Sequence, residues 1–200
     1  MPLDRQRIVT EAVALLDEAG LEGVTLRKLA ARLGVQAPTL YWHLRNKADL
    51  VTALSEAILE AEFPEVDPPG PGERWQDWLA TLAGRLRRAM LAHPDGARVV
   101  SAAQLSTTMA GISERAMRSL VKQGVPLREA RLTVLAVERF TIGHVLEEQA
   151  PRPTEEEVAD IDLAAMAEQY PTMLTAIREY FQDGRTVDDL FRDTLKIIIR

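Results

Sequence analysis

The chain has 200 residues, no cysteine and a formal net charge of −6 at pH 7. The lack of cysteine excludes disulfides, thiolate metal sites and cysteine nucleophiles. No apolar run approaches the ~20 residues of a membrane span, and the first residues do not resemble a signal peptide. We therefore expect a cytoplasmic protein that does not contact membranes, with either one large core or a small domain followed by a larger one.

The charge is unevenly distributed along the chain. The first 50 residues carry seven Lys or Arg and six Asp or Glu, a balance of +1, whereas the remaining residues carry 17 and 24, a balance of −7. Most of the N-terminal cations lie between Arg27 and Lys47. A locally basic head on an acidic body would orient on DNA while limiting non-specific binding.

Residues 25–50 predict two short helices joined by a tight turn, followed by the start of a third helix. Thr25 suits an N-cap, Gly34 suits the left-handed end of the first helix, and Pro38 suits the first turn of the second. Leu29 and Leu33 belong to an apolar stripe at helical spacing. This is the layout of a helix-turn-helix motif, in which the second helix, here residues 37–43, enters the DNA major groove.

The second helix leaves an aromatic and polar run at the surface, formed by Thr39, Tyr41, Trp42 and His43. The alternative is an ordinary pair of helices that buries Tyr41 and Trp42 in a core. A core hairpin has no need of such a run, so we favour a DNA-binding surface.

Every long segment after the head has a helical pattern, and no stretch alternates convincingly like a strand. A linker at residues 63–73, with four prolines and two glycines, is the clearest boundary signal. We predict an all-α protein with a three-helix DNA-binding head at 1–46, a connecting helix at 47–62 and a larger ligand-binding and dimerisation domain at 74–200. Helices of that domain are expected near residues 74–92, 107–123, 127–149, 170–182 and 186–199, with a loop over 150–160.

The last helix, near 186–199, carries more apolar surface than a terminal helix of a monomer should expose. Together with the helix near 127–149 it predicts the four-helix seam of a homodimer. The alternative is that it packs only on its own subunit.

Candidate catalytic and metal sites are weak. His144 and Glu147 are three residues apart, as two metal ligands can be, but a site needs three or four ligands and no further cluster matches them. The sequence also contains no catalytic or phosphate-binding motif. We therefore expect no metal, no cofactor and no enzymatic activity.

The segment from Leu3 to Leu59 resembles the DNA-binding head of the TetR family. The segments at 75–79, 95–99, 123–127 and 136–149 resemble the ligand-binding core of the tetracycline-binding members of that family, so the resemblance covers roughly three quarters of the chain. It implies a homodimer, a double-stranded DNA operator with two-fold symmetry, and a small-molecule effector that releases the protein from DNA.

The resemblance also implies which side chains of the head contact DNA. Arg27 matches a base-reading arginine, whose guanidinium can grip guanine, and Lys47 matches a clamp on the phosphate backbone. Gln36 and Ala37 depart from the family members that bind tetracycline, so a different operator is expected. The full set of expected contacts is Thr25, Arg27, Gln36, Ala37, Pro38, Thr39, Tyr41, Trp42, His43 and Lys47.

The ligand pocket departs further from that pattern. Phe63 and Val100 stand where the tetracycline-binding members have histidines, and Leu82, Ala103 and Ala116 replace an Asn, a Thr and a Gln of their pocket. These apolar residues cannot hold a hydrated Mg²⁺, so we expect a larger, more apolar pocket for a hydrophobic or polycyclic molecule. The expected lining is Phe63, Leu82, Leu86, Val100, Ala103, Met109, Ala116, Met117, Val134 and Glu147.

Among these positions, Glu147 is the residue that the chain shares with the pocket of the tetracycline-binding members, and two interpretations of its role stay open. It could accept a hydrogen bond from a ligand across the dimer, or it could be a solvated helix residue beside Glu148.

For the whole chain, the predicted function is a ligand-responsive transcriptional repressor. The alternatives are a small-molecule binding module without DNA regulation and a transcriptional activator of the same fold.

Overall fold

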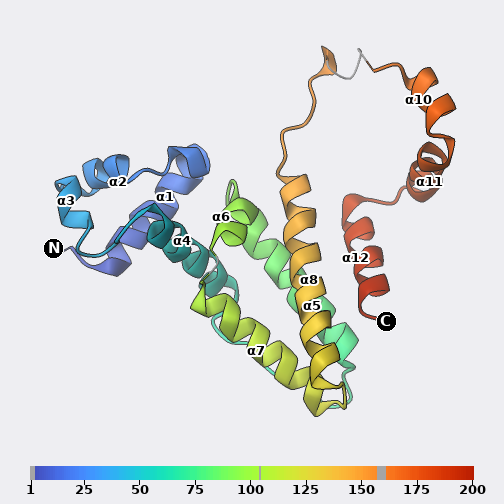
Figure 1. Ribbon diagram of the computed structural model, residues 1–200, viewed down its shortest axis with the longest axis horizontal. Coiled ribbons are helices and arrows are strands. Elements are labelled where there is room, and N and C mark those ends of the chain that lie inside the picture. Colours follow the sequence, from blue (N-terminus) through green and yellow to red (C-terminus); the bar gives the residue numbers. More distant parts are fainter. Residues whose placement is uncertain (1–2, 104, 157–160) are drawn as a thin grey trace.

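The computed structural model describes residues 3–103, 105–156 and 161–200. These residues form α-helices and loops and contain no strand, which confirms the all-α prediction. Figure 1 shows a small head at one end, formed by the first three helices, and a larger body at the other. Helix α4 joins the two parts.

The head is built from α1 (Arg5–Gly23), α2 (Leu26–Leu33) and α3 (Ala37–Leu40). The side chain of Thr25 accepts the N–H of Lys28 at the start of α2, and Gly34 ends α2 with a φ of 69°, as the sequence predicts. Ile8, Leu16 and Leu40 are fully buried and form part of the head's core. The caps and the apolar stripe therefore fix the two helices of the motif.

The second helix of the motif is shorter than predicted. Helix α3 spans only Ala37–Leu40 instead of residues 37–43. The chain then continues in hydrogen-bonded turns, in which the N–H groups of His43 and Leu44 both donate to the carbonyl of Leu40. The fully buried Leu44 anchors these turns to the core of the head.

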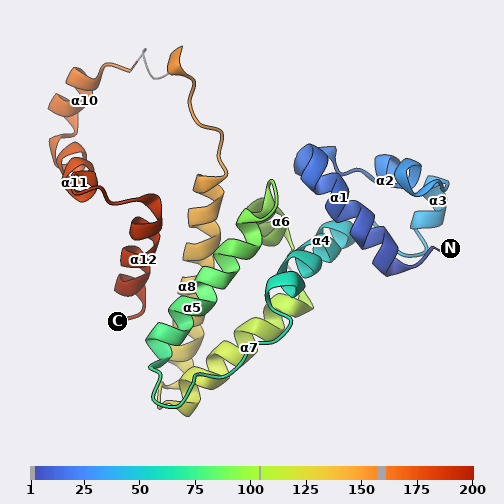
Figure 2. The ribbon, with the colours of Figure 1, turned by 180° about the vertical axis from the view of Figure 1, so that it is seen from behind.

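The connecting helix α4 (Lys47–Glu62) has the predicted bounds. It begins at Asn46, whose side chain accepts the N–H of Asp49 at 2.9 Å. Its inner face is buried along its length, from Leu50 through Leu54 to Ile58. Figures 1 and 2 show this helix running out of the head and into the body, so one rigid element touches both.

The body contains α5 (Trp75–Leu91), α6 (Gly96–Ala102), α7 (Thr107–Lys122), α8 (Leu127–Glu148) and α12 (Val187–Ile198). Helix α5 lies at its centre and packs against α4, α6, α7, α8 and α12. Met90 of α5 and Leu120 of α7 are fully buried there. The turn into α6 needs glycine, because a Cβ on Gly96 would lie 2.1 Å from the carbonyl oxygen of Met90.

Between α8 and α12 the chain forms α10 (Leu163–Gln169) and α11 (Pro171–Phe181), which arch away from the body in Figure 1. Helix α11 matches the helix predicted near 170–182, whereas α10 was not predicted. The loop expected over 150–160 is irregular at residues 151–154 and helical at 155–156, and its last part, 157–160, lies outside the described residues. No helix in the described part of the chain is long and apolar enough to cross a membrane.

Candidate DNA-binding surface and ligand-binding region

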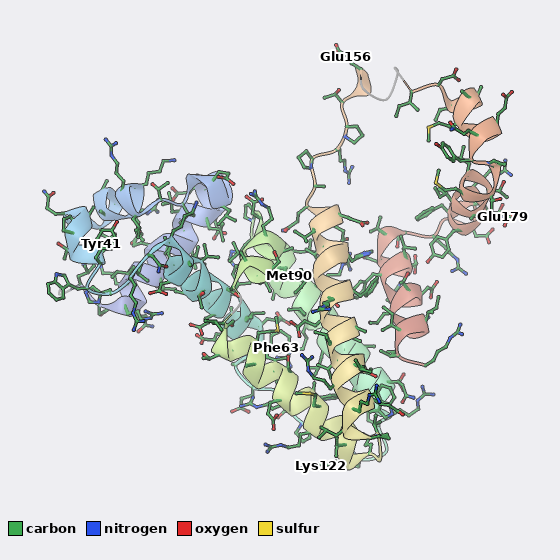
Figure 3. All side chains as sticks on the ribbon, viewed as in Figure 1. Tyr41, Phe63, Met90, Lys122, Glu156 and Glu179 are labelled. Carbon is green, nitrogen blue, oxygen red and sulfur yellow. The ribbon has the colours of Figure 1, made fainter. Side chains whose placement is uncertain are left out.

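The predicted DNA-binding residues lie on the accessible surface of the head. Trp42 is 88% exposed and Tyr41 is 55% exposed, and Figure 3 shows Tyr41 at the end of the head farthest from the body. The alternative of a core hairpin that buries these two aromatic side chains is therefore wrong. The other exposed members are Arg27, Gln36, Pro38, Thr39 and Lys47, and the partly exposed ones are Thr25, Ala37 and His43.

Two further cations lie beside this surface. Arg5 and Arg45 line a shallow depression of about 390 Å³ together with Trp42 and His43. A guanidinium N–H of Arg5 donates to the carbonyl of His43 at 3.2 Å, although the two residues are 38 apart in the chain. From the sequence, Arg5 is only one of several cations in the head. No sequence pattern near Arg5 indicates that the start of α1 lies against His43.

The head is fixed to the body by polar contacts between the end of α1 and the α5–α6 turn. The carboxylate of Asp95 accepts the N–H of Leu21 at 2.9 Å, and this hydrogen bond, helped by Arg98, lowers the pKa of Asp95. Asp17 lies 2.6 Å from His93, and Arg98 reaches Glu22 at 2.8 Å. The position of the head therefore depends on the segment that leads into α6.

The predicted pocket residues are divided between two spaces. The first is a small apolar cavity of about 40 Å³ between α5, α7 and α8. A water molecule occupies about 30 Å³ of the liquid, so this cavity is far smaller than the enlarged pocket that the sequence predicts. The branched side chains of Leu82 and Leu86 fill the region instead of widening it. The predicted residues that line it are Leu82, Leu86, Met109, Ala116 and Val134.

The second space is an open groove of about 740 Å³ between α7 and α8. Four predicted pocket residues line it, namely Val100, Ala103, Met109 and Met117. Ser113 and Glu138, which were not predicted, line both the groove and the small cavity. The hydroxyl of Ser113 donates to a carboxylate oxygen of Glu138 at 3.3 Å, so the two side chains are paired where they line these spaces.

Two predicted pocket residues lie apart from both spaces. Phe63 is buried at the end of α4, with the guanidinium carbon of Arg85 lying 4.4 Å from its ring centroid. Glu147 is exposed on α8. Neither residue therefore lines the small cavity or the groove in the described structure.

His144, the other half of the weak metal pair, has a different environment. Its ring contacts those of Phe140 and Phe191 in a tilted arrangement, at centroid distances of 5.6 and 5.1 Å. Burial lowers its pKa. Arg87 lies beside this cluster and bridges Glu148 of α8 and Asp188 of α12.

Comparisons with known families cover both parts of the chain. The family described as "Bacterial regulatory proteins, tetR family" matches residues 8–54, and the one described as "Tetracyclin repressor-like, C-terminal domain" matches residues 68–200. The chain is 34% identical over 197 residues to the class C tetracycline repressor protein of Escherichia coli, covering 98% of this chain and 89% of that protein.

Solved structures agree with these matches. A variant of TetR from Acinetobacter baumannii AYE in complex with minocycline is 32% identical, with a TM-score of 0.73 and coverage of 99% of this chain and 95% of that chain. BioQ with its natural double-stranded DNA operator is 30% identical, with a TM-score of 0.68 and coverage of 76% and 90%. The head, the body and the matches to both family domains lead to one conclusion: the chain belongs to the TetR family of bacterial transcriptional regulators.

Proposed function

We propose that this protein is a repressor that binds a two-fold symmetric operator as a homodimer and is released by a small, largely apolar molecule. The observation that carries the proposal is the exposed Thr39–His43 surface at the outer end of the head, joined through α4 to the groove between α7 and α8. The class C relative is a repressor by name, and the two solved relatives hold an operator in one case and minocycline in the other.

A set of hydrogen bonds between α7 and α4, which we call the latch, supports the coupling of the groove to the head. The N–H and hydroxyl of Thr107, in the first turn of α7, both donate to Glu56 of α4, at 3.1 and 2.7 Å. The hydroxyl of Thr108 donates to Glu60 at 3.2 Å. Because α7 is one wall of the groove and α4 enters the head, a ligand that displaces α7 would shift α4 and change the distance between the two heads of a dimer.

The proposed dimer uses α8 and α12. The two helices pack side by side (Figures 1 and 2), and each presents a large apolar side chain to solvent. Leu132 of α8 is 57% exposed and Ile197 of α12 is 60% exposed. Burial of such side chains against a second copy would form a four-helix seam.

Selection of bound sequences from a pool of random double-stranded DNA tests the proposal. We expect the purified protein to enrich a symmetric site whose half-sites are about one helical turn, or ~10 base pairs, apart. Enrichment of no sequence, with ligand binding intact, would overturn the proposal in favour of a binding module without DNA regulation.

Two variants divide the expected DNA contacts by their role. Arg27→Ala should relax base preference at one position of each half-site and cost about 1–3 kcal/mol of binding free energy. Lys47→Ala should weaken binding to all sequences alike and reduce the salt slope by about 1, because it removes a phosphate contact. If both variants changed only the salt slope, Arg27 would not read bases.

A further inference from the structure

Glu138 lies where the small cavity between α5, α7 and α8 meets the larger groove between α7 and α8. It lies in the middle of α8, is partly buried and lines both spaces. The polar contact found for its carboxylate is the hydroxyl of Ser113, at 3.3 Å. Met109 and Ser113 also line both spaces, so Glu138 belongs to the wall that the two spaces share.

The charge of Glu138 has no cationic partner in the parts of the chain that the structure describes, where no Lys, Arg or His nitrogen forms an ion pair with it within 4.0 Å. The other charged residues of the groove are exposed. They are Glu114, which pairs with Arg118, and the two arginines Arg131 and Arg139. Water screens these exposed charges more than it screens a partly buried carboxylate.

The walls around Glu138 are mainly apolar. Met109 lines both spaces, Ile142 and Leu146 line the groove, and Leu82 and Val134 line the cavity. A partly desolvated carboxylate among such side chains gains most from a partner that is itself charged and donates a hydrogen bond. A protonated amine on an apolar body supplies both properties.

We infer that the groove between α7 and α8 selects small molecules that carry a protonated amine on an apolar polycyclic body, with Glu138 as the residue that determines this preference. The inference rests on the proposed function, because it names the chemical class of that function's effector. The ammonium group would lie at Glu138 and the polycyclic body along the side chains of α7 and α8.

Three probes of equal shape and different charge test the inference. They are 9-(aminomethyl)anthracene, 9-anthracenemethanol and 9-anthracenecarboxylic acid, which are cationic, neutral and anionic at pH 7, and their fluorescence reports binding directly. We expect the wild-type protein to bind the cation at least tenfold more tightly than the alcohol, and the carboxylate most weakly. Equal affinity for all three probes, tightest binding of the carboxylate, or no binding of any probe would overturn the inference.

Two variants with the same change in net charge locate the preference. Glu138→Gln removes the carboxylate but keeps the shape of the side chain, and should reduce the cation-to-alcohol ratio to near one. Glu129→Gln, an exposed site in the first turn of the same helix, should keep the wild-type ratio. Circular dichroism and melting temperature report whether each variant folds. A folded Glu138→Gln variant with the wild-type ratio would also overturn the inference.

The same probes separate this inference from the proposed function. If the cation binds preferentially through Glu138 but does not change DNA affinity, the inference stands and the proposed role of the groove in operator release fails. If a symmetric operator is enriched but the probes bind without charge preference, the proposed DNA binding stands and the inference fails.

Discussion

Trp42 leaves 88% of its surface in solvent, although an indole usually gains from burial. It belongs to the same exposed run as Tyr41 and His43, at the outer end of the head. An exposed aromatic side chain contributes little to folding and is available for contact with another molecule. The head can therefore lose this side chain without losing its fold.

Substitution of Trp42 should separate stability from DNA binding. Trp42→Ala should change the free energy of unfolding by less than about 0.5 kcal/mol, because the side chain has few contacts to lose, but should weaken binding to the selected operator. Trp78→Ala is the matched control, since Trp78 is buried and its indole N–H donates to the carbonyl of Asp67 at 3.0 Å. We expect the control to lose about 3–5 kcal/mol. Denaturant titration measures the free energy of unfolding of both variants, and an operator titration measures their affinity for DNA. A Trp42 variant that unfolds as easily as the Trp78 variant would contradict this prediction.

The sequence predicts the exposed residues of the head better than the lining of the pocket, for a physical reason. The position of Tyr41 follows from local spacing, because its neighbours Leu40 and Leu44 must point into the core. Whether Phe63 faces a cavity depends instead on how α4 and α5 pack, and here Arg85 covers its ring. Glu138 and Ser113 were missed because only the meeting of α7 and α8 brings them together.

Among the helices, those with capping residues and an apolar stripe could be predicted closely. Helix α4 has the predicted bounds, and α12 begins at Thr186 with a capping box in which Thr186 and Asp189 bond reciprocally. Helix α10 could not be found in this way, because it is only seven residues long and so is too short to show a repeating apolar pattern. Helix α3 is short because its final turn is replaced by the turns that bury Leu44.

The latch between α4 and α7 should carry the ligand response. Glu56→Ala removes the acceptor of both Thr107 bonds. We expect ligand affinity to stay within about twofold of wild type, while the ligand-induced change in DNA affinity shrinks, because α7 then moves without α4. Fluorescence titration of the ligand and of labelled operator DNA measures the two quantities, with Glu129→Ala as the control. An unchanged ligand response in the Glu56 variant would show that coupling runs through other contacts.

The partly buried histidine of α8, His144, should make stability depend on pH. The pKa of His144 is lowered from 6.5, mainly by burial and also by Arg87, while the carboxylates of Glu148, Glu147 and Asp188 act in the opposite direction. The unfolded chain therefore binds this proton more readily than the folded chain, so the stability present above about pH 6.5 is lost as the pH falls through the lower, folded pKa.

The replacement His144→Phe tests this sign, because a phenylalanine ring can keep the contacts with Phe140 and Phe191 without titrating. The variant should lose less stability than the wild type between about pH 7 and pH 5.5. The denaturation midpoints of the two proteins, measured across this pH range, test the prediction. If the midpoints of the variant and the wild type fall equally with pH, His144 does not cause the loss of stability.

For the molecule as a whole, the exposed apolar side chains of α8 and α12 predict assembly. Replacing both Leu132 and Ile197 by Glu should place charges in the proposed seam and yield a monomer in analytical ultracentrifugation. Leu105→Glu is the control, because Leu105 is 86% exposed on the turn before α7 and should not affect assembly. A wild-type protein that sediments as a monomer at micromolar concentration, or a double variant that remains a dimer, would contradict the proposed interface.

The claim that unites head, latch and groove is that occupancy of the groove lowers affinity for DNA. It is tested most directly by titrating the selected operator with the protein, with and without saturating 9-(aminomethyl)anthracene, and following fluorescence anisotropy. We expect the Kd for DNA to rise at least tenfold with the ligand present, a coupling of about 1.4 kcal/mol. A Kd that stays the same while the probe fills the groove would contradict it.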